Sequence, residues 1–299
     1  MPLTPDEAVR LLSDYGGRAR IIAGGTDLLV DMRAALSDPA QAGSVQPHHA
    51  LVDITRIPDM TRIEQDGDYI VIGAGVTHTQ IVASNLLRHH AACLVESCGV
   101  VGGPQVRNVA TLGGNVAHAL PAGDGTTSLV ALDAQAEIIQ NGERRWVNIL
   151  DMFIGTAKSL VDPTRDLLVR FRFRTADSRE ATAFSRVMRP QGVALPILGC
   201  AVWIKLNAAR THYELARVCI APVAPTPKRA DAVEAALAGQ PVGEAAIEAA
   251  IEAAESSLHP RTSKFRATAA YRDEIMGVLL RRTLSAAVQR ATDPAPSTP

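Results

Sequence analysis

The chain has 299 residues, of which 47% are hydrophobic and 20% charged, and its formal net charge at pH 7 is -1. This composition is typical of a globular protein of one or two domains. The near-neutral charge argues against a protein that binds nucleic acid by neutralising phosphates. No apolar run approaches the roughly 20 residues that span a bilayer, and the N-terminus lacks signal-peptide features. We therefore expect no membrane span and a cytoplasmic location.

The N-terminal segment predicts a small α/β unit. Thr4 is a helix N-cap, Pro5 suits the first turn and Glu7 completes a capping box, so a helix is expected up to Gly16 and Gly17. Two short apolar runs that favour β-strands follow, with a segment that contains proline and glycine between them. They predict strands at 20–23 and 51–54, with a loop at 37–49 between them.

The rest of the chain alternates strand-like and helix-like segments, and Asn141-Gly142 is a strong hairpin signal. In the middle we expect strands at 69–74, 136–140, 145–148 and 167–174, and helices at 77–87, 91–98 and 125–133. A polar cluster at 175–179 predicts a domain boundary. Beyond it we expect strands at 200–206 and 214–220, helices at 230–238, 244–257 and 267–290, and a disordered tail from 291.

Two glycine-rich segments carry the strongest functional signal. They are Ala23-Gly24-Gly25-Thr26-Asp27-Leu28, after the apolar run Ile21-Ile22, and Thr111-Leu112-Gly113-Gly114-Asn115. Without a Cβ, a Gly-Gly pair adopts positive φ and turns its N–H groups toward one point. Either pair alone is better explained as a turn. Together they suit a pyrophosphate held between two loops.

A third glycine segment resembles a dinucleotide-binding fingerprint but does not complete it. Gly73-Ala74-Gly75 follows a predicted strand, as in a dinucleotide fingerprint, but His78 stands where that fingerprint has its third glycine. A side chain of this size opposes the close helix–strand packing that the third glycine permits. We therefore do not assign dinucleotide binding to this segment.

The residues around the two loops resemble a known family. Residues 102–133, read with 21–33, are similar to the FAD-binding medium subunit, or domain, of the molybdenum hydroxylases. That family includes xanthine dehydrogenase and aerobic carbon monoxide dehydrogenase. The resemblance continues at 221–230 and 271–282, and so covers nearly the whole chain.

The resemblance implies an α+β fold with two parts. The first is an FAD-binding domain of the PCMH type at 1–176, with subdomains at about 1–55 and 56–176. The second, at 177–290, is an α+β C-terminal flavoprotein domain with a small antiparallel sheet and helices. Residues 291–299 are the expected disordered tail.

The resemblance also implies the cofactor-binding residues. Both glycine loops are expected to hold the FAD pyrophosphate, through Ala23, Gly24, Gly25, Thr26, Asp27, Leu28, Thr111, Leu112, Gly113, Gly114 and Asn115. Asp124 matches a family acid near the cofactor, although it also suits a helix N-cap. Val101 and Leu168 match positions near the flavin, although core packing explains them equally. Arg186 is a candidate cation beside the flavin pyrimidine, and a solvated surface arginine is the alternative.

No residue pattern predicts a metal site or catalytic side chains in this chain. The cysteines, Cys93, Cys98, Cys200 and Cys219, form no C-x-x-C pair, and their apolar surroundings predict buried thiols. No cysteine lies between Asp124 and Asp166, where the related 4-hydroxybenzoyl-CoA reductases carry an extra iron–sulfur cluster. The paired histidines read as solvated, whereas His118 is a candidate for the flavin pocket.

The implied function is electron transfer through FAD in a molybdenum hydroxylase. A small subunit with 2Fe–2S clusters and a large subunit with molybdopterin are the expected partners, assembled as a dimer of heterotrimers. The terminal acceptor stays open among NAD, oxygen, a quinone and others. Two alternatives remain at this point: a stand-alone flavin oxidoreductase of the same fold, and a flavin-free binding or assembly module whose Gly pairs are turns.

Overall fold

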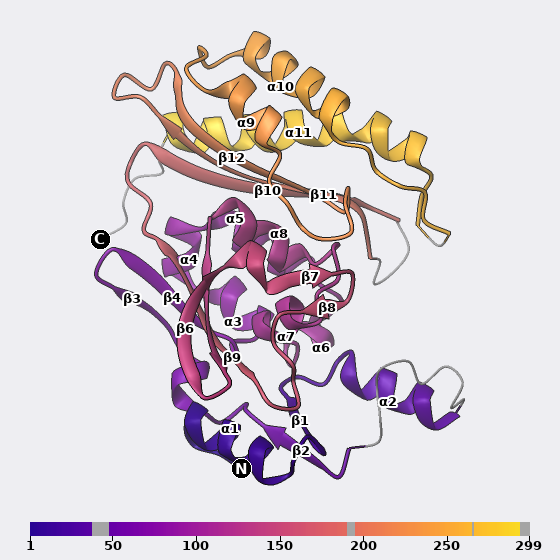
Figure 1. Ribbon diagram of the computed structural model, residues 1–299. Helices are drawn as coiled ribbons and strands as arrows, with labels where there is room; N and C mark the ends of the chain where they lie inside the picture. Colours follow the sequence, from indigo (N-terminus) through magenta and orange to yellow (C-terminus); the bar gives the residue numbers. More distant parts are fainter. Residues whose placement is uncertain (38–47, 190–194, 265, 294–299) are drawn as a thin grey trace.

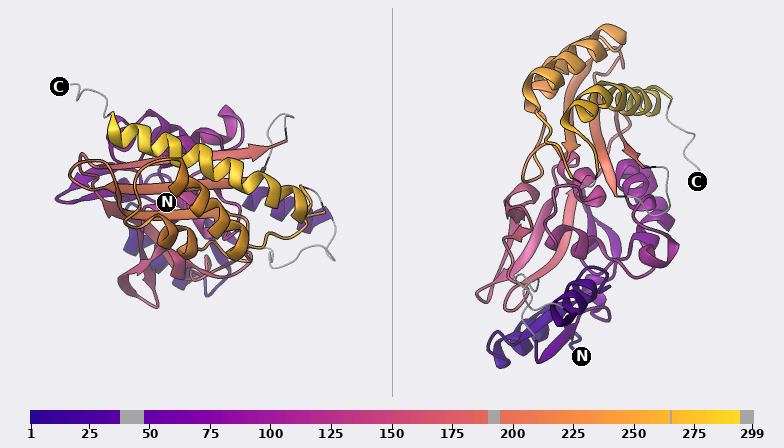
Figure 2. Two further views of the ribbon diagram at one scale, coloured as in Figure 1. Left: turned by 90° about the horizontal axis from the view of Figure 1, so that it is seen from above. Right: turned by 90° about the vertical axis from the view of Figure 1, so that its right-hand side faces the viewer.

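The computed structural model describes residues 1–37, 48–189, 195–264 and 266–293. Its helices and strands are stacked in three regions, from the N-terminal unit at one end to the C-terminal sheet and helices at the other (Figure 1). The side view in Figure 2 shows the same elongated order. The α+β fold expected from the sequence is confirmed. The division at 1–55, 56–176 and 177–290 remains our proposal.

The N-terminal unit is built on two parallel strands. Its elements are α1 (Pro5–Asp14), β1 (Ala19–Ile22), α2 (Leu28–Ser37) and β2 (Ala50–Asp53). Thr4 is the N-cap of α1, as predicted, and its hydroxyl accepts from the Glu7 amide at 3.2 Å. The Glu7 carboxylate accepts from the Leu3 amide instead of the Thr4 amide, so the predicted capping box is only half formed. Most of the predicted loop at 37–49 lies outside the described residues.

The middle region contains a five-stranded antiparallel sheet. Its strands, in spatial order, are β3 (Ile63–Asp66), β4 (Tyr69–Gly73), β9 (Leu167–Arg174), β5 (Gln135–Gln140) and β6 (Glu143–Asn148). The turn between β5 and β6 has positive φ at Asn141 and Gly142, which confirms the hairpin. A small hairpin follows, with β7 (Phe153–Gly155) and β8 (Lys158–Ser159).

Short helices cover this sheet. They are α3 (His78–Ala83), α4 (Asn85–His90), α5 (Ala92–Gly99), α6 (Pro104–Arg107), α7 (Leu112–Ala117) and α8 (Asp124–Ala131). The single helix predicted at 77–87 is wrong, because Ser84 has an extended backbone. Its hydroxyl accepts from the Leu87 amide at 3.2 Å and so caps the start of α4.

The C-terminal region is a three-stranded antiparallel sheet between two helical layers. The strands, in order, are β10 (Glu180–Met188), β11 (Pro196–Leu206) and β12 (Tyr213–Ala221). One face carries α9 (Asp231–Leu237), α10 (Glu244–Ser257) and α11 (Ala269–Thr292), and the other packs on α5 and α8 (Figures 1 and 2). The element β10 was not predicted. Because α11 continues to Thr292, the tail does not begin at 291 as expected, and 294–299 lie outside the described residues.

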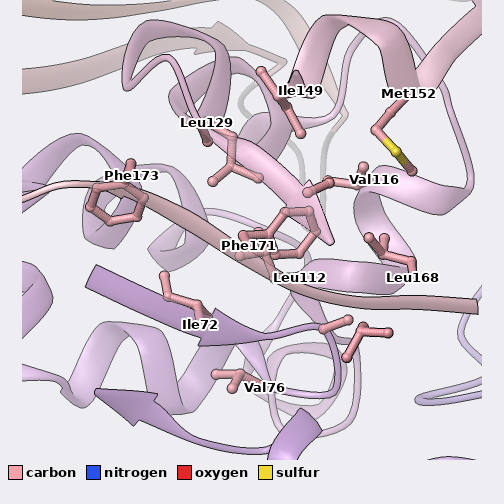
Figure 3. Close-up of a cluster of buried hydrophobic side chains, with 14 of the residues drawn as sticks. Ile72, Val76, Leu112, Val116, Leu129, Ile149, Met152, Leu168, Phe171 and Phe173 are labelled. Carbon is pink, nitrogen blue, oxygen red and sulfur yellow. The ribbon is translucent and has the colours of Figure 1, made fainter. Parts of the chain in front are cut away.

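Two hydrophobic cores support these regions. The larger lies between the five-stranded sheet and its helices, where Leu112, Phe171 and Phe173 are buried together (Figure 3). The smaller lies between the C-terminal sheet and α9 to α11. All four cysteines are buried in these regions, as predicted, and burial raises the pKa of each thiol.

Polar contacts join the two cores at the junction of α5 and β10. The Glu96 carboxylate accepts from the Phe184 amide at 2.7 Å and pairs with Arg290. The Thr182 hydroxyl accepts from the Cys93 amide at 3.0 Å. Among the described helices, none combines the length and apolar character needed to cross a bilayer. The described residues also include no group of acids, cysteines or histidines arranged to hold a metal.

Gly73 allows β4 to lie close to the backbone of Met60, and this contact leads to a prediction about stability. A Cβ at this position would lie 2.2 Å from the carbonyl carbon and oxygen of Met60. Gly73→Ala should therefore force β4 away from Met60 and lower the free energy of unfolding by about 3 kcal/mol. Gly99→Ala is the control, because a Cβ there meets only Val82 Cγ2, at 3.7 Å. Equal urea midpoints for the two variants would contradict this account.

Candidate functional site

A cleft of about 410 Å³ connects the three regions of the molecule. Its walls come from the N-terminal unit, the helical layer of the middle region and the near edge of the C-terminal sheet. Of the predicted cofactor-binding residues, those that line it are Ala23, Gly24, Gly25, Thr26, Asp27, Leu28, Val101, Thr111, Gly113, Gly114, Asn115, Asp124, Leu168 and Arg186. The volume is in the range of small-molecule sites.

Leu112 is the exception among the predicted residues. Its side chain is fully buried and points into the core beside Phe171 (Figure 3). Its amide donates to the Val76 carbonyl at 3.0 Å. Leu112 therefore packs behind the loop and does not line the cleft, and its assignment as a cofactor-binding residue stays a prediction.

The first glycine loop offers amide donors to the cleft. It joins β1 to α2, and Gly25 has φ +69°, as the sequence predicted. In the described part of the chain, no acceptor is present for the amide N–H groups of residues 24–28. The Thr26 hydroxyl oxygen is also buried there without a partner. This concentration of unused donors at the start of a helix suits an anion.

Gly24 allows this loop to touch the second one. A Cβ on Gly24 would lie 2.0 Å from the Val109 carbonyl oxygen, so only glycine fits. The contact holds the loop against the segment that leads into Thr111 and α7. The two glycine segments, far apart in sequence, therefore meet at the cleft, as the pyrophosphate hypothesis requires.

The second glycine segment differs from its prediction. It is the first turn of α7, and neither Gly113 nor Gly114 has positive φ. The Thr111 hydroxyl accepts from the Gly114 amide at 3.0 Å, and the Gly113 amide donates to the Ala74 carbonyl at 2.9 Å. The expected second nest of amide donors is therefore wrong, because the protein uses these donors itself. The segment contributes a wall without bulky side chains and the side-chain amide group of Asn115.

A buried ion pair closes the cleft at the C-terminal domain. Arg186 of β10 donates to an Asp124 oxygen at 2.6 Å, and each side chain is 7% exposed. Burial raises the pKa of Asp124 to about 6, and the positive charge of Arg186 opposes the shift. Arg186 is thus not a solvated surface residue. Asp124 is also not an N-cap, since Gly123 precedes the helix and makes no side-chain cap.

Apolar and aromatic side chains complete the walls. Leu168 of β9 is 6% exposed and lies at the edge of the core (Figure 3), and it also lines the cleft. Its position beside the flavin stays a prediction. Val101 lines the cleft from the segment between α5 and α6. His118, at the end of α7, also lines the cleft, and its contact with the flavin stays a prediction.

Several further lining residues were missed from the sequence, among them Arg20, His78, Asp166 and Arg266. His78 is almost fully buried, its Nδ1 has no partner, and burial lowers its pKa to about 4. One Asp166 carboxylate oxygen is likewise buried without a partner. For His78 the sequence offered one signal, its place at the third glycine position of the fingerprint. Arg20, Asp166 and Arg266 lie in segments without a motif.

The Asp124 carboxyl predicts a measurable pH effect. Because folding raises its pKa, the folded chain holds this proton more tightly than the unfolded chain between pH 3.8 and about 6. Its contribution to the free energy of unfolding therefore falls as the pH rises, by up to about 3 kcal/mol. Asp124→Asn should abolish this component in urea titrations at pH 4 and 7. Asp68→Asn, at an exposed position, is the control. Parallel pH profiles of wild type and Asp124→Asn would contradict the prediction.

Comparison with known proteins identifies the family. Residues 1–173 match the model of the FAD binding domain in molybdopterin dehydrogenase. Residues 182–287 match the CO dehydrogenase flavoprotein C-terminal domain. The chain is 29% identical to the carbon monoxide dehydrogenase medium chain of Hydrogenophaga pseudoflava, covering 97% of this chain and 96% of that protein.

Other relatives and a solved structure agree. The chain is 30% identical to the 6-hydroxypseudooxynicotine dehydrogenase complex subunit alpha of Paenarthrobacter nicotinovorans, over 96% of this chain and 92% of that one. A carbon monoxide dehydrogenase structure from Hydrogenophaga pseudoflava superposes with a TM-score of 0.85 at 30% identity, covering 97% and 96% of the two chains. The chain therefore belongs to the FAD-binding subunits of the molybdenum hydroxylase family, which are oxidoreductases.

Proposed function

We propose that this chain binds one FAD noncovalently in the cleft and relays electrons through it. The observation that carries the proposal is the first glycine loop, where the amide donors at 24–28 and the Thr26 hydroxyl have no partner among the described residues. These donors fit the doubly charged pyrophosphate of FAD, because main-chain N–H groups can bind phosphates without needing a lysine or arginine. No cysteine or histidine lies in either glycine segment to form a covalent link.

Each part of the cleft has a role in this proposal. The loop at 23–28 binds the phosphates, and the segment at 111–115 forms the opposite wall. Val101 and Leu168 pack against the ring system, and Asp124 with Arg186 lies at the ring's polar edge. Bound FAD supplies a group that exchanges either one or two electrons, while the protein binds and orients it and sets its electrostatic surroundings. No acid–base side chain is required of this chain.

The relay needs partner subunits. We propose an iron–sulfur small subunit that delivers single electrons and a molybdopterin large subunit that oxidises the substrate, in a dimer of heterotrimers. The support is that relatives of nearly equal length are a medium chain and a subunit of a dehydrogenase complex. The substrate pocket then belongs to the large subunit, and the external acceptor receives electrons from this chain. The cytoplasmic location stays a prediction.

Thr26→Val tests the phosphate loop. The isosteric change removes a buried hydroxyl that has no partner, so the flavin-free chain should be as stable as wild type or more stable. It also removes a hydrogen bond to FAD, so the dissociation constant should rise about tenfold, near 1.4 kcal/mol. Flavin fluorescence quenching and thermal melts give the two readings. Thr283→Val, whose hydroxyl bonds within α11, is the control and should leave FAD affinity unchanged. Unchanged affinity in Thr26→Val would remove Thr26 from the site.

The relay itself is tested by reconstitution. The purified chain should contain FAD after acid precipitation and chromatography, but candidate aldehydes, purines and N-heterocycles should leave its flavin absorbance unchanged. Co-expression with the neighbouring iron–sulfur and molybdenum subunits should give substrate-dependent bleaching of the flavin. Bleaching in the isolated chain would favour a stand-alone flavin oxidoreductase, and a colourless chain would favour a flavin-free module.

A further inference from the structure

Charge is distributed unevenly along the cleft. At the N-terminal unit the lining groups are Arg20 and three acids, Asp27, Asp31 and Asp166, with a net charge of -2. Asp166 belongs to this end because the nearby Pro163 carbonyl accepts from the Ile21 amide of β1 at 2.9 Å. At the C-terminal domain the acidic and basic lining groups other than histidine are Asp124, Arg186 and Arg266, with a formal net charge of +1 at pH 7.

Arg266 makes the second end positive. It lies in the segment between α10 and α11, is partly buried and reaches the same cleft as the Asp124–Arg186 pair. Burial lowers the pKa of Arg266, and the negative charge of Asp124 opposes this shift. Its carbonyl accepts from the Arg189 guanidinium at 3.3 Å, which ties the segment to the end of β10. Two guanidinium groups and one carboxylate therefore line this end of the cleft, and their formal charges sum to +1.

We propose that Arg266, together with Arg186, stabilises the negative charge of the reduced flavin and thereby raises its reduction potential. The inference depends on the proposed function, in which the cleft holds FAD. Two-electron reduction adds two electrons and one proton to the oxidised ring, which leaves one negative charge on its pyrimidine side. The electrons come from the iron–sulfur partner, and the proton comes from water. A net positive charge beside that edge favours the reduced form.

The opposite end of the cleft fits the other half of FAD. The unpartnered Asp166 oxygen is an acceptor only, so it suits hydroxyl or amino donors, which adenosine has. Adenosine gains no charge during reduction, and a net charge of -2 beside the ring would oppose electron uptake. The charge distribution therefore orients the ring system toward Asp124, Arg186 and Arg266.

Arg266→Gln tests the proposal in the full chain loaded with FAD. The equilibrium constant for two-electron reduction, measured against a reference dye, should fall about tenfold, which corresponds to a potential about 30 mV lower. Affinity of the oxidised flavin for sulfite, which adds one negative charge to the ring, should fall in parallel. Arg266→Lys should restore most of both values. Asp124→Asn, which removes the opposing charge, should shift both in the other direction.

Arg174→Gln is the matched control. It removes the same charge from an exposed side chain of β9 that does not line the cleft. Melting temperatures of the flavin-free variants report any loss of fold. If Arg266→Gln and Arg174→Gln have the same potential and sulfite affinity as wild type, the inference about Arg266 is wrong, although FAD binding stands. If the wild-type chain retains no FAD, the proposed function itself fails.

Discussion

Two contacts between bare backbones hold the cleft together. Gly24 lies against the Val109 carbonyl, and Gly113 against Ala74, at distances that leave no space for a Cβ. The first contact joins the N-terminal unit to the helical layer, and the second fixes α7 to the end of β4. Because both partners are main chain, no side-chain movement relieves a clash there. These two backbone contacts therefore set the position of the phosphate loop relative to the opposite wall of the cleft.

The remaining features of the site depend on burial of charge. Asp124 and Arg186 come from different regions of the chain and are paired where little water reaches. Breaking such a pair is costly because it leaves a single buried charge. The pair therefore fixes the C-terminal sheet against α8 in one register, and it places a polar edge at the C-terminal end of the cleft. Glu96 and Arg290 strengthen the same junction from outside.

Much of the fold was predictable from the sequence, because the signals are local. Thr4 caps α1, Asn141-Gly142 forms the hairpin turn, and α10 has the predicted bounds. The two glycine segments were recognised, but the role of the second was misjudged. Whether Gly113 offers its amide to a ligand depends on Ala74, which is remote in sequence. For the same reason no local pattern placed His78, Asp166 or Arg266 at the cleft, because their positions there are set by tertiary packing.

The origin of the cleft walls in three separate regions has a thermodynamic consequence. A molecule that contacts all three walls is bound only while the regions keep their mutual positions, so its binding free energy adds to the stability of their packing. The cofactor then acts as a structural brace as well as a redox group. The abundance of intact protein in a cell would accordingly depend on the supply of flavin during folding, and a shortage would expose the junction around α8 and β10 to proteolysis.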